Sequence, residues 1–432
     1  MKHLMMNMLL SILVIYKLCD MKNIRYFTEE SIFENSKCSL KKDTILFAED
    51  TKTCFFEKGA YFKCIYNITT IDEETTLIKS VNGIINMSID GQDVDITTSY
   101  KFDTLGTHKV LFYIDKCTLL QNNPSFNSVT NLIEIYFPKN VKRINDGSFC
   151  NCTSLKKVIF DTNAQTTNWG CNPFTGCTSL EEFTMPIRVN ENICGDSGGS
   201  FKGCTSLKKF TIPKNSFMTK MDKYLLSGAT SVEEIRIEDG ANINLNGAFS
   251  DLTNLKRIYI GDSVTNGVGS IYRRNLEEVV VSKNNTKYDS RDNCNAIIET
   301  ATNKLIVGGK TTIIPNTVEI IGGSAFSLIN DLKTINIPDS VTTIEDYGLA
   351  YGDYLTGVTI GSGITSIGDE AFYKQTKLSS IRIYAKTAPT LGEYVFTLCK
   401  SSGVVYYPKG SDYSSWKSAD RIKQWSFIEF EP

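Results

Sequence analysis

Hydrophobic residues return in one frame through most of the chain from residue 131 onward. In the clearest copy, Leu332 is followed by Ile335 and Ile337, with polar Asn336 between the isoleucines, and then by Pro338. Alternation of apolar and polar positions predicts a short strand that turns one face inward. Proline has no N–H to donate, so Pro338 is expected to end the strand and turn the chain.

The leucine that opens this frame has counterparts at spacings of 21 to 29 residues. The eleven anchor positions are Leu132, Leu155, Leu180, Leu207, Val232, Leu255, Leu276, Leu305, Leu332, Leu355 and Leu378. Repeats of this length are typical of a solenoid, in which no unit buries its apolar face alone and stacking creates one continuous core. The sequence therefore predicts about eleven stacked coils over residues 131–400.

The second half of each copy places a small residue before a phenylalanine, as in Ser324-Ala325-Phe326 and Glu370-Ala371-Phe372. We expect one helical or 3₁₀ turn at these positions, with the phenylalanine in the core. Burial of each such side chain contributes roughly 1.5–3 kcal/mol. The predicted fold is a solenoid with a β-strand and a short helical or 3₁₀ turn in each coil, preceded by a small all-β region.

These residues resemble the BspA-like (Treponema pallidum-type) leucine-rich repeats of bacterial surface proteins and some parasitic protists. The period, the proline, the Ala-Phe pair and the Cys-Thr-Ser-Leu segments that begin at Cys152, Cys177 and Cys204 all coincide. The resemblance covers about residues 131–400 and implies a leucine-rich-repeat solenoid. Members of the family are associated with adhesion to host proteins or to other cells.

The segments before the repeats break their frame. Residues 21–76 are expected to form a small β-rich module, and residues 77–120 an immunoglobulin-like β spacer that caps the solenoid. Within the spacer, Asp90-Gly91 between two alternating runs predicts a β-hairpin.

Residues 401–432 also leave the repeat and are rich in aromatic side chains, including Trp416 and Trp425. The last coil of a solenoid exposes apolar surface and needs a cover. We therefore expect an aromatic C-terminal cap, with a carbohydrate-stacking site as the alternative.

Residues 1–20 hold a mostly apolar run from residue 4 to residue 16, which is too short to span a membrane comfortably. Asn7 interrupts the run, and bulky Tyr16-Lys17-Leu18 stands where a cleavage site has small residues. Met21 is an alternative start. Two interpretations stay open, an export signal and a mis-assigned start, and no stable transmembrane span is expected.

Charge is balanced, with 46 Lys and Arg against 48 Asp and Glu. No basic stripe is present, so nucleic acid is not an expected partner. Charged residues do occupy the exposed strand positions, where a protein or glycan ligand could bind. The candidate partner-binding strand face comprises Lys156, Glu182, Lys208, Glu234, Lys256, Glu278 and Lys333.

Three of the 13 cysteines share one place in the repeat, three residues before the anchor leucine. They are Cys152, Cys177 and Cys204, and later copies place Ala229, Leu252 or Ile329 there. A position that accepts these residues is buried and apolar, where free cysteine behaves as a small hydrophobe. We expect a ladder of reduced cysteines, with disulfides across adjacent coils as the alternative.

One motif suggests protease chemistry. Ser197 lies in a Gly-Asp-Ser-Gly-Gly segment that matches the nucleophile signature of chymotrypsin-like proteases. That chemistry needs a histidine base and an orienting carboxylate. The chain has two histidines, His3 in the leader and His108 in a predicted strand without the flanking motif. No catalytic residue is expected, and an enzyme would reveal itself by an activity lost in Ser197→Ala.

Two further motifs suggest ligands. Gly308-Gly309-Lys310 is similar to a phosphate-binding loop but lacks its earlier glycine, since Lys304 stands there, and a predicted strand follows. The acidic positions Asp90, Asp93 and Asp95 lack the later glutamate of a calcium-binding EF-hand. We expect a turn between coils and a solvated hairpin edge, with no cofactor and no metal.

The sequence thus favours a non-catalytic binding scaffold, a bacterial cell-surface or secreted leucine-rich-repeat protein for adhesion or protein or glycan recognition. The alternative is a structural, host-recognition protein of a phage tail, in the cytoplasm or virion, with translation starting at Met21. That alternative rests on residues 22–66, which resemble short segments of tail-associated proteins of bacteriophages.

Overall fold

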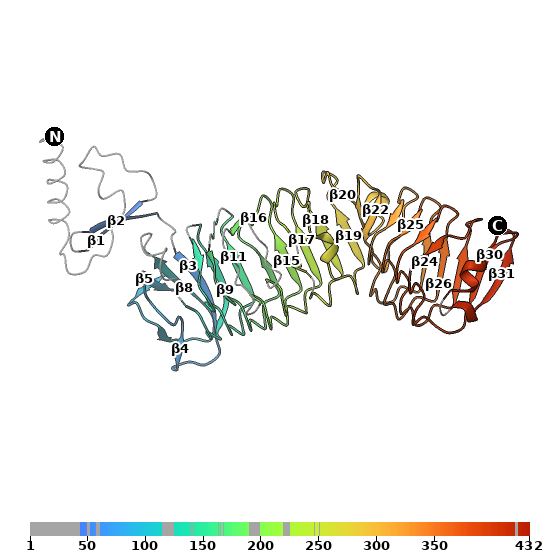
Figure 1. The fold of residues 1–432 in the computed structure, drawn as a ribbon. Helices are drawn as coiled ribbons and strands as arrows, with labels where there is room; N and C mark the ends of the chain where they lie inside the picture. Colours follow the sequence, from blue (N-terminus) through green and yellow to red (C-terminus); the bar gives the residue numbers. More distant parts are fainter. Residues whose placement is uncertain are drawn as a thin grey trace, which may run out of the picture.

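The computed structural model describes residues 44–49, 52–57, 61–114 and 125–432, apart from residues 140, 163, 165, 167, 190–198, 219–224, 246, 250, 420 and 421. The leader at residues 1–20 and Ser197 lie outside the described residues. The chain forms an elongated β-solenoid with a β-rich region at its N-terminal end (Figure 1). The predicted solenoid is therefore confirmed.

The N-terminal region contains an isolated hairpin and a sheet that continues into the solenoid. The hairpin is β1 (Thr44–Glu49) with β2 (Lys52–Glu57). The six-stranded sheet has the order β11-β9-β3-β8-β5-β6. Its strands are β3 (Tyr61–Ile68), β5 (Ile84–Ile89), β6 (Gln92–Val94), β8 (Gly106–Ile114), β9 (Leu132–Phe137) and β11 (Lys157–Phe160). The β5–β6 hairpin predicted at Asp90-Gly91 is confirmed.

Because β3 is hydrogen-bonded to both β8 and β9, the first coil has a partner strand on its open side. This arrangement covers an edge that would otherwise offer unpaired backbone groups to other chains. A small two-stranded sheet, β4 (Glu74–Thr76) with β7 (Ser99–Lys101), lies in the same region.

Each coil has three sides, and the first is the strand predicted from the Leu-x-x-Ile-x-Ile pattern. These strands pair in parallel, so each coil lies in register on the next. One run comprises β13 (Glu182–Thr184), β15 (Lys209–Ile212), β17 (Glu234–Ile237), β18 (Arg257–Ile260) and β19 (Glu278–Val281). The other comprises β24 (Thr334–Ile337), β26 (Gly357–Ile360), β28 (Ser380–Ile383), β30 (Val404–Pro408) and β31 (Ser426–Phe430).

The second side of the coil is a strand of two residues after the proline. In the C-terminal half these strands join one parallel ladder, namely β23 (Ile320–Ile321), β25 (Thr343–Ile344), β27 (Ser366–Ile367) and β29 (Thr390–Leu391). In the N-terminal half they form two pairs, β10 (Arg143–Ile144) with β12 (Asn168–Trp169) and β14 (Arg188–Val189) with β16 (Phe217–Met218).

The third side is the Ala-Phe segment, which forms a hydrogen-bonded turn rather than a regular helix. The N–H of Ala325 donates to the oxygen of Gly322, and the N–H of Phe326 donates to Gly348 of the next coil. Ser324 and Leu328 flank this turn with positive φ angles of 59° and 64°, which a continuing right-handed helix does not allow. The predicted burial of the phenylalanine is confirmed.

Phenylalanines from successive turns stack in the core. The rings of Phe126, Phe149, Phe174 and Phe201 follow one another at centroid distances of 5.1, 5.2 and 5.6 Å, with interplanar angles of 10° or less. Offset stacking of this kind adds to the stabilisation that burial provides. Each phenylalanine thus contacts the equivalent phenylalanine of the coil before and after it, and these contacts stabilise neighbouring coils.

The cysteine ladder runs beside these rings. Cys152, Cys177 and Cys204 are free and buried. The residues that occupy the same place in later coils, Ala229, Leu252 and Ile329, are also buried. Each thiol donates a hydrogen bond to a phenylalanine carbonyl of the preceding coil, at sulfur–oxygen distances of 2.9 to 3.1 Å. Burial raises the pKa of Cys152 and of Cys204 to about 12. Elsewhere, Cys171 is disulfide-bonded.

The stack is interrupted between β19 and β24, where it bends (Figure 1). Leu305 was predicted as an anchor of the first side, and this prediction is wrong. It lies in β22 (Lys304–Val307), which pairs in parallel with the short strand β23 on the second side. The spacing of the neighbouring anchors concealed an antiparallel excursion, β20 (Tyr288–Asp289) and β21 (Ile297–Glu299), before β22.

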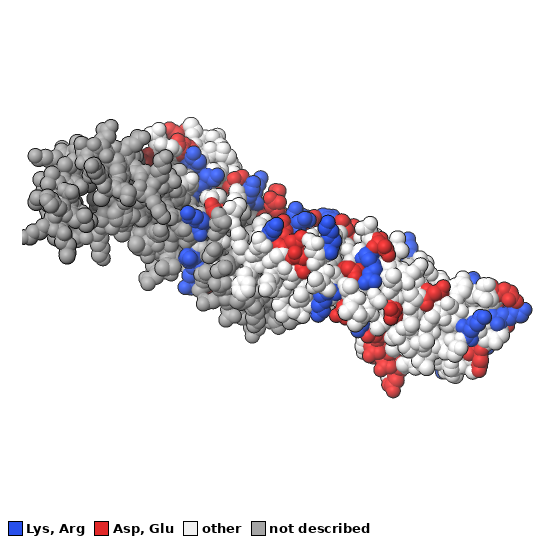
Figure 2. Space-filling view, turned by 90° about the horizontal axis from the view of Figure 1, so that it is seen from above, with Lys and Arg blue, Asp and Glu red and all other residues white. Residues whose placement is uncertain are grey.

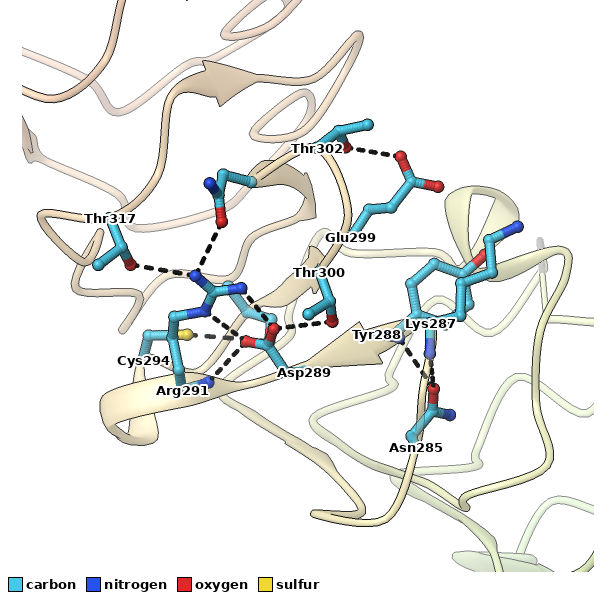
Figure 3. A network of polar contacts seen from close by, with 12 residues as sticks. Asn285, Lys287, Tyr288, Asp289, Arg291, Cys294, Glu299, Thr300, Thr302 and Thr317 are labelled. Carbon is cyan, nitrogen blue, oxygen red and sulfur yellow. Dashed lines mark hydrogen bonds and ion pairs between the residues drawn. The ribbon is translucent and has the colours of Figure 1, made fainter.

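A polar network holds this excursion (Figure 3). Arg291 donates two hydrogen bonds to the carboxylate of Asp289, at 2.8 and 2.6 Å, and one to Asn303 at 2.9 Å. Thr300 donates to the same carboxylate at 2.9 Å. A bidentate pair fixes geometry as well as charge, so the network sets the path of the chain through the interruption. The 3₁₀ helix η2 (Arg291–Asn293) lies in this part of the chain, whereas η1 (Val268–Ser270) lies earlier, between β18 and β19.

The tail continues the stack. Trp416 in α3 (Ser414–Lys417) and Trp425 after η3 (Ile422–Gln424) are buried in the C-terminal core. Their indole N–H groups donate to the oxygens of Pro389 and Lys400, at 3.1 and 3.0 Å. Buried rings cannot stack on a sugar, so the carbohydrate-stacking alternative for these tryptophans is wrong.

Candidate functional site

The strand side between β13 and β19 carries two parallel columns of charged residues, which we call the charge ladder. Backbone hydrogen bonds fix its register, since Lys208, Glu233, Lys256 and Glu277 each donate through N–H to the oxygen of the residue one coil earlier. The first column is Glu181, Lys208, Glu233, Lys256 and Glu277, and the second is Glu182, Lys209, Glu234, Arg257 and Glu278. The sign alternates at every step in both columns.

Ion pairs connect consecutive coils within each column. In the first column, Glu233 receives Lys208 and Lys256, each at 3.0 Å. In the second, Glu234 receives Lys209 at 3.5 Å and Arg257 at 3.2 Å. Exposed pairs of this kind contribute about 0–1 kcal/mol each to stability, so the ladder is a surface pattern more than a source of stability.

The ion pairs shift the acid groups of the ladder. Hydrogen bonds from Lys256 and then Lys208 hold the pKa of Glu233 below its usual range. Lys310, beyond the first column, donates to Glu277 at 2.8 Å and lowers the pKa of that carboxyl. The carboxyl groups of Glu233 and Glu277 therefore stay ionised to a lower pH than an unpaired glutamate does.

The structure places five of the seven predicted residues in the two columns and the other two outside the ladder. Lys208 and Lys256 lie in the first column, and Glu182, Glu234 and Glu278 in the second. Lys156 precedes β11, on the coil before the ladder, and Lys333 precedes β24 on the far side of the interruption, where threonine follows it.

Sequence reasoning missed the other half of the ladder. Glu181, Lys209, Glu233, Arg257 and Glu277 each stand next to a predicted residue, and all lie one or two positions after an anchor. The sequence does show two consecutive charged residues in each of these coils. The alternation of sign from coil to coil, however, depends on how the strands are aligned with one another. Figure 2 shows one face of the molecule, on whose described part acidic and basic side chains lie among each other.

The motifs that suggested other chemistry are occupied by internal contacts. The ring of His108 lies 2.7 Å from Asp90 through Nδ1 and 3.0 Å from the oxygen of Thr104 through Nε2. The N–H of Gly309 donates to the hydroxyl of Thr312 at 2.8 Å, and a turn rather than a helix follows. Within the described part of the chain, no group of three or more His, Cys, Asp or Glu residues is placed to hold a metal ion.

A family model agrees with the coil geometry. The model of the BspA-type leucine-rich repeat region, in six copies, matches residues 120–215, 197–297 and 308–415, which together exceed half of the chain. The chain belongs to the BspA-type leucine-rich repeat family. The resemblance drawn from the repeat residues is thereby confirmed, and the chain is a repeat-based binding scaffold. No curated protein shows significant similarity to this BspA-type chain.

Several solved structures are similar to the BspA-type chain at low identity. A leucine-rich repeat protein from Eubacterium ventriosum is 22% identical, with 71% of this chain and 68% of that chain covered and a TM-score of 0.32. A leucine-rich cell surface protein from Faecalibacterium prausnitzii is 18% identical, with coverages of 93% and 98% and a TM-score of 0.36. A leucine-rich repeat protein from Bacteroides ovatus is 18% identical, with coverages of 72% and 78% and a TM-score of 0.31.

Proposed function

We propose that this chain is a non-catalytic scaffold at the bacterial cell surface that recognises a protein or glycan through its strand face. The charge ladder supports this proposal more than any other feature. Ten charged side chains are held at the spacing of a parallel sheet, about 4.8 Å from coil to coil. Complementary charge gives specificity and association rate more than affinity, so the ladder suits a partner with its own periodic charges.

The surface location is part of the same proposal, and the family's association with surface proteins supports it. Within the described residues no helix is both long and apolar enough to cross a membrane. Terminal-peptide mass spectrometry on fractionated cells tests the location. A chain cleaved near residue 20 and recovered with the envelope or medium is expected, whereas a chain that begins at Met21 in the cytosol contradicts it.

Inverting the ladder tests the proposed face without unfolding the protein. In the triple variant Lys208→Glu, Glu233→Lys and Lys256→Glu, both ion pairs that Glu233 makes in wild type keep opposite charges with the signs reversed. Glu181 and Glu277, at the two ends of the column, each gain one like-charged neighbour on the exposed surface. We expect a melting temperature within about 2 °C of wild type, because exposed pairs contribute little. Binding to a panel of immobilised extracellular-matrix proteins and glycans should fall at least about tenfold for the partner that wild type retains.

The matched control inverts an ion pair away from the ladder, with Lys409→Glu and Glu431→Lys, whose atoms lie 2.8 Å apart. This control should bind as wild type does, and wild-type binding should weaken at about 0.5 M salt, where charges are screened over a few ångströms. Equal binding by the inverted ladder and the control, or no retained partner in the panel, would contradict the proposal.

A further inference from the structure

The turn side of the coils carries two columns of residues in the left-handed region of backbone conformation. One column lies two residues before the core phenylalanine or its equivalent, and the other lies two residues after it. In the C-terminal half, φ at these positions runs from 52° to 64°. The first column there is Ser324, Tyr347, Glu370 and Tyr394, and the second is Leu328, Tyr351, Lys374 and Leu398.

The N-terminal half fills the same columns mostly with glycine and asparagine. Among its described residues, the left-handed positions in these columns are Ser128, Gly147, Asn151, Asn172, Gly176, Gly203, Gly228 and Gly247. Glycine and asparagine adopt positive φ at little cost, whereas bulky residues do so rarely and with strain. The C-terminal half has tyrosine and leucine at positions where glycine or asparagine would adopt the same backbone conformation with less strain. Strain retained in this way points to a function for the side chains.

These side chains form one apolar surface, which we call the tyrosine edge. Its exposed members include Leu328, Tyr351, Tyr394 and Leu398, with 40%, 38%, 61% and 49% of their surface open to solvent. The ring of Tyr351 lies 6.3 Å from that of Tyr347 in the same coil and 5.3 Å from that of Tyr373 in the next, so the aromatic surface continues from one of these coils to the other. Contiguous apolar surface of this kind marks an interaction site.

The two charged residues in these columns belong to the same coil. Glu370 stands in the first column and Lys374 in the second, and Glu370 accepts a hydrogen bond from the hydroxyl of Tyr347 at 2.9 Å. Backbone hydrogen bonds join each turn to the next, as from Tyr347 to Asp369 and from Tyr351 to Tyr373. The columns are therefore parallel rows along the solenoid, and one coil contributes an acidic residue to the first row and a basic residue to the second.

We propose that the tyrosine edge binds a second copy of this chain, with the two solenoids side by side in the same direction. A twofold axis between the edges, parallel to the solenoid, places the first column of one copy against the second column of the other. Glu370 then meets Lys374 twice, Tyr347 meets Tyr351, and Tyr394 meets Leu398. An isologous interface requires such self-complementarity.

The composition of the edge favours a protein surface over a sugar. Leu328 and Leu398 provide aliphatic surface that a hydroxyl-rich ligand does not match. Exposed tyrosines are typical of protein interfaces, and the charge on this edge is limited to one acidic and one basic residue, Glu370 and Lys374. A dimer built here leaves the charge ladder on a different side of the coil, so the two surfaces act independently.

Asparagine substitutions test the interface without loss of fold, because asparagine already occupies these columns at Asn151 and Asn172. In wild type we expect sedimentation velocity to show a monomer–dimer equilibrium below about 100 μM. The variant Tyr351→Asn, Tyr394→Asn and Leu398→Asn should be monomeric over this range with an undiminished melting temperature. The control Gly203→Asn, where an added Cβ meets nothing closer than 3.7 Å, should dimerise as wild type does.

Charge reversal tests the predicted orientation. Glu370→Lys alone and Lys374→Glu alone each create two like-charge contacts and should weaken dimerisation about tenfold. Mixed in equal amounts, the two variants restore both opposite-charge contacts and should form a heterodimer of wild-type affinity. A wild-type monomer throughout the range, a dimer that survives the asparagine substitutions, or no recovery on mixing would each overturn the proposal.

Discussion

At the scale of single residues, the position three before the anchor shows how one place in a repeat accepts different chemistry. Cys152, Cys177 and Cys204 fill it with thiols that also donate to a backbone oxygen, and Ala229 fills it with a methyl group alone. The position accepts small or apolar side chains because it is buried. The thiol adds a hydrogen bond between coils.

This position predicts a loss of stability in alkaline solution. The pKa of Cys152 and of Cys204 rises from 9.0 to about 12 on folding, because burial penalises the thiolate. The unfolded chain therefore loses protons first, and the free energy of unfolding should fall as the pH rises from about 9 toward 12. Urea titrations across this range measure the decline.

The control replaces Cys152, Cys177 and Cys204 with alanine, which Ala229 shows the position to accept. Its stability should fall less steeply over the same pH range. An equal slope in the variant and the wild type would contradict the assignment of the decline to the cysteine ladder.

At the scale of elements, the excursion through β20, β21 and β22 separates two hydrophobic cores. Contacts across it bypass more than 50 residues of chain, since Arg273 donates to the oxygen of Ser324 and Asn330 donates to Asn275 at 3.0 Å. Arg273 also donates to the oxygen of Gly269 at 2.6 Å. Burial lowers the pKa of Arg273 to about 10, because removal from water penalises the charged guanidinium. The hydrogen bonds to the two backbone oxygens offset part of this penalty.

Replacing Arg273 with methionine should uncouple the two halves. Backbone oxygens left unsatisfied cost about 1–3 kcal/mol, and coils that contact only their neighbours then unfold in separate blocks. Trp169 reports on the first core, and Trp416 with Trp425 on the second. In urea, the two fluorescence transitions should coincide in wild type and separate in Arg273→Met, when each probe is isolated by Trp→Phe changes.

Lys310→Met serves as the comparison, because its ion pair with Glu277 spans the same interruption on the exposed surface. Its transitions should stay together. Coincident transitions in Arg273→Met would show that other contacts carry the coupling.

The repeat frame itself was predictable at this scale. Ile335 and Ile337 alternate inward in β24, and Pro338 follows its last residue, as the local pattern required. The excursion was not predictable from spacing, because Leu305 is buried and correctly periodic yet belongs to another side of the coil. Hydrophobic periodicity reports burial, whereas the choice of sheet depends on which strand lies alongside.

At the scale of the whole molecule, the two ends of the stack are closed differently. At the N-terminal end, β3 pairs with β9 in antiparallel fashion. At the C-terminal end, Trp416 packs against Phe396 at a ring distance of 5.7 Å, and Tyr413 donates to the oxygen of Ala385 at 2.8 Å. We propose that residues 401–432 act as the cap expected from the sequence.

A chain that ends after residue 400 should aggregate and melt at a lower temperature, because the last coil then exposes Phe396 and its neighbours. Static light scattering and a thermal melt measure both effects. Removing only residues 431 and 432, which are exposed, should leave both unchanged. A soluble truncated chain with an unaltered melting temperature would contradict a capping role.

The candidate site shows how far the sequence reached. The sequence identified charged residues on exposed strand positions, because side chains alternate between the two faces of a strand and a residue next to an inward-facing isoleucine points outward. It did not identify the ladder, since Lys209 faces Glu234 only through the register of β15 on β17. The spacing of the anchors differs from coil to coil, so spacing along the chain does not fix which residues become neighbours.

The local order of apolar and polar residues was sufficient to predict the family resemblance, the solenoid, the repeating inward-facing strand and the buried positions of each coil. Tertiary structure alone decided the alternating charge ladder, the division into two cores at Arg273 and the tyrosine edge. These features join residues a coil or more apart. Their positions follow from how neighbouring coils pack and pair, which local periodicity does not specify.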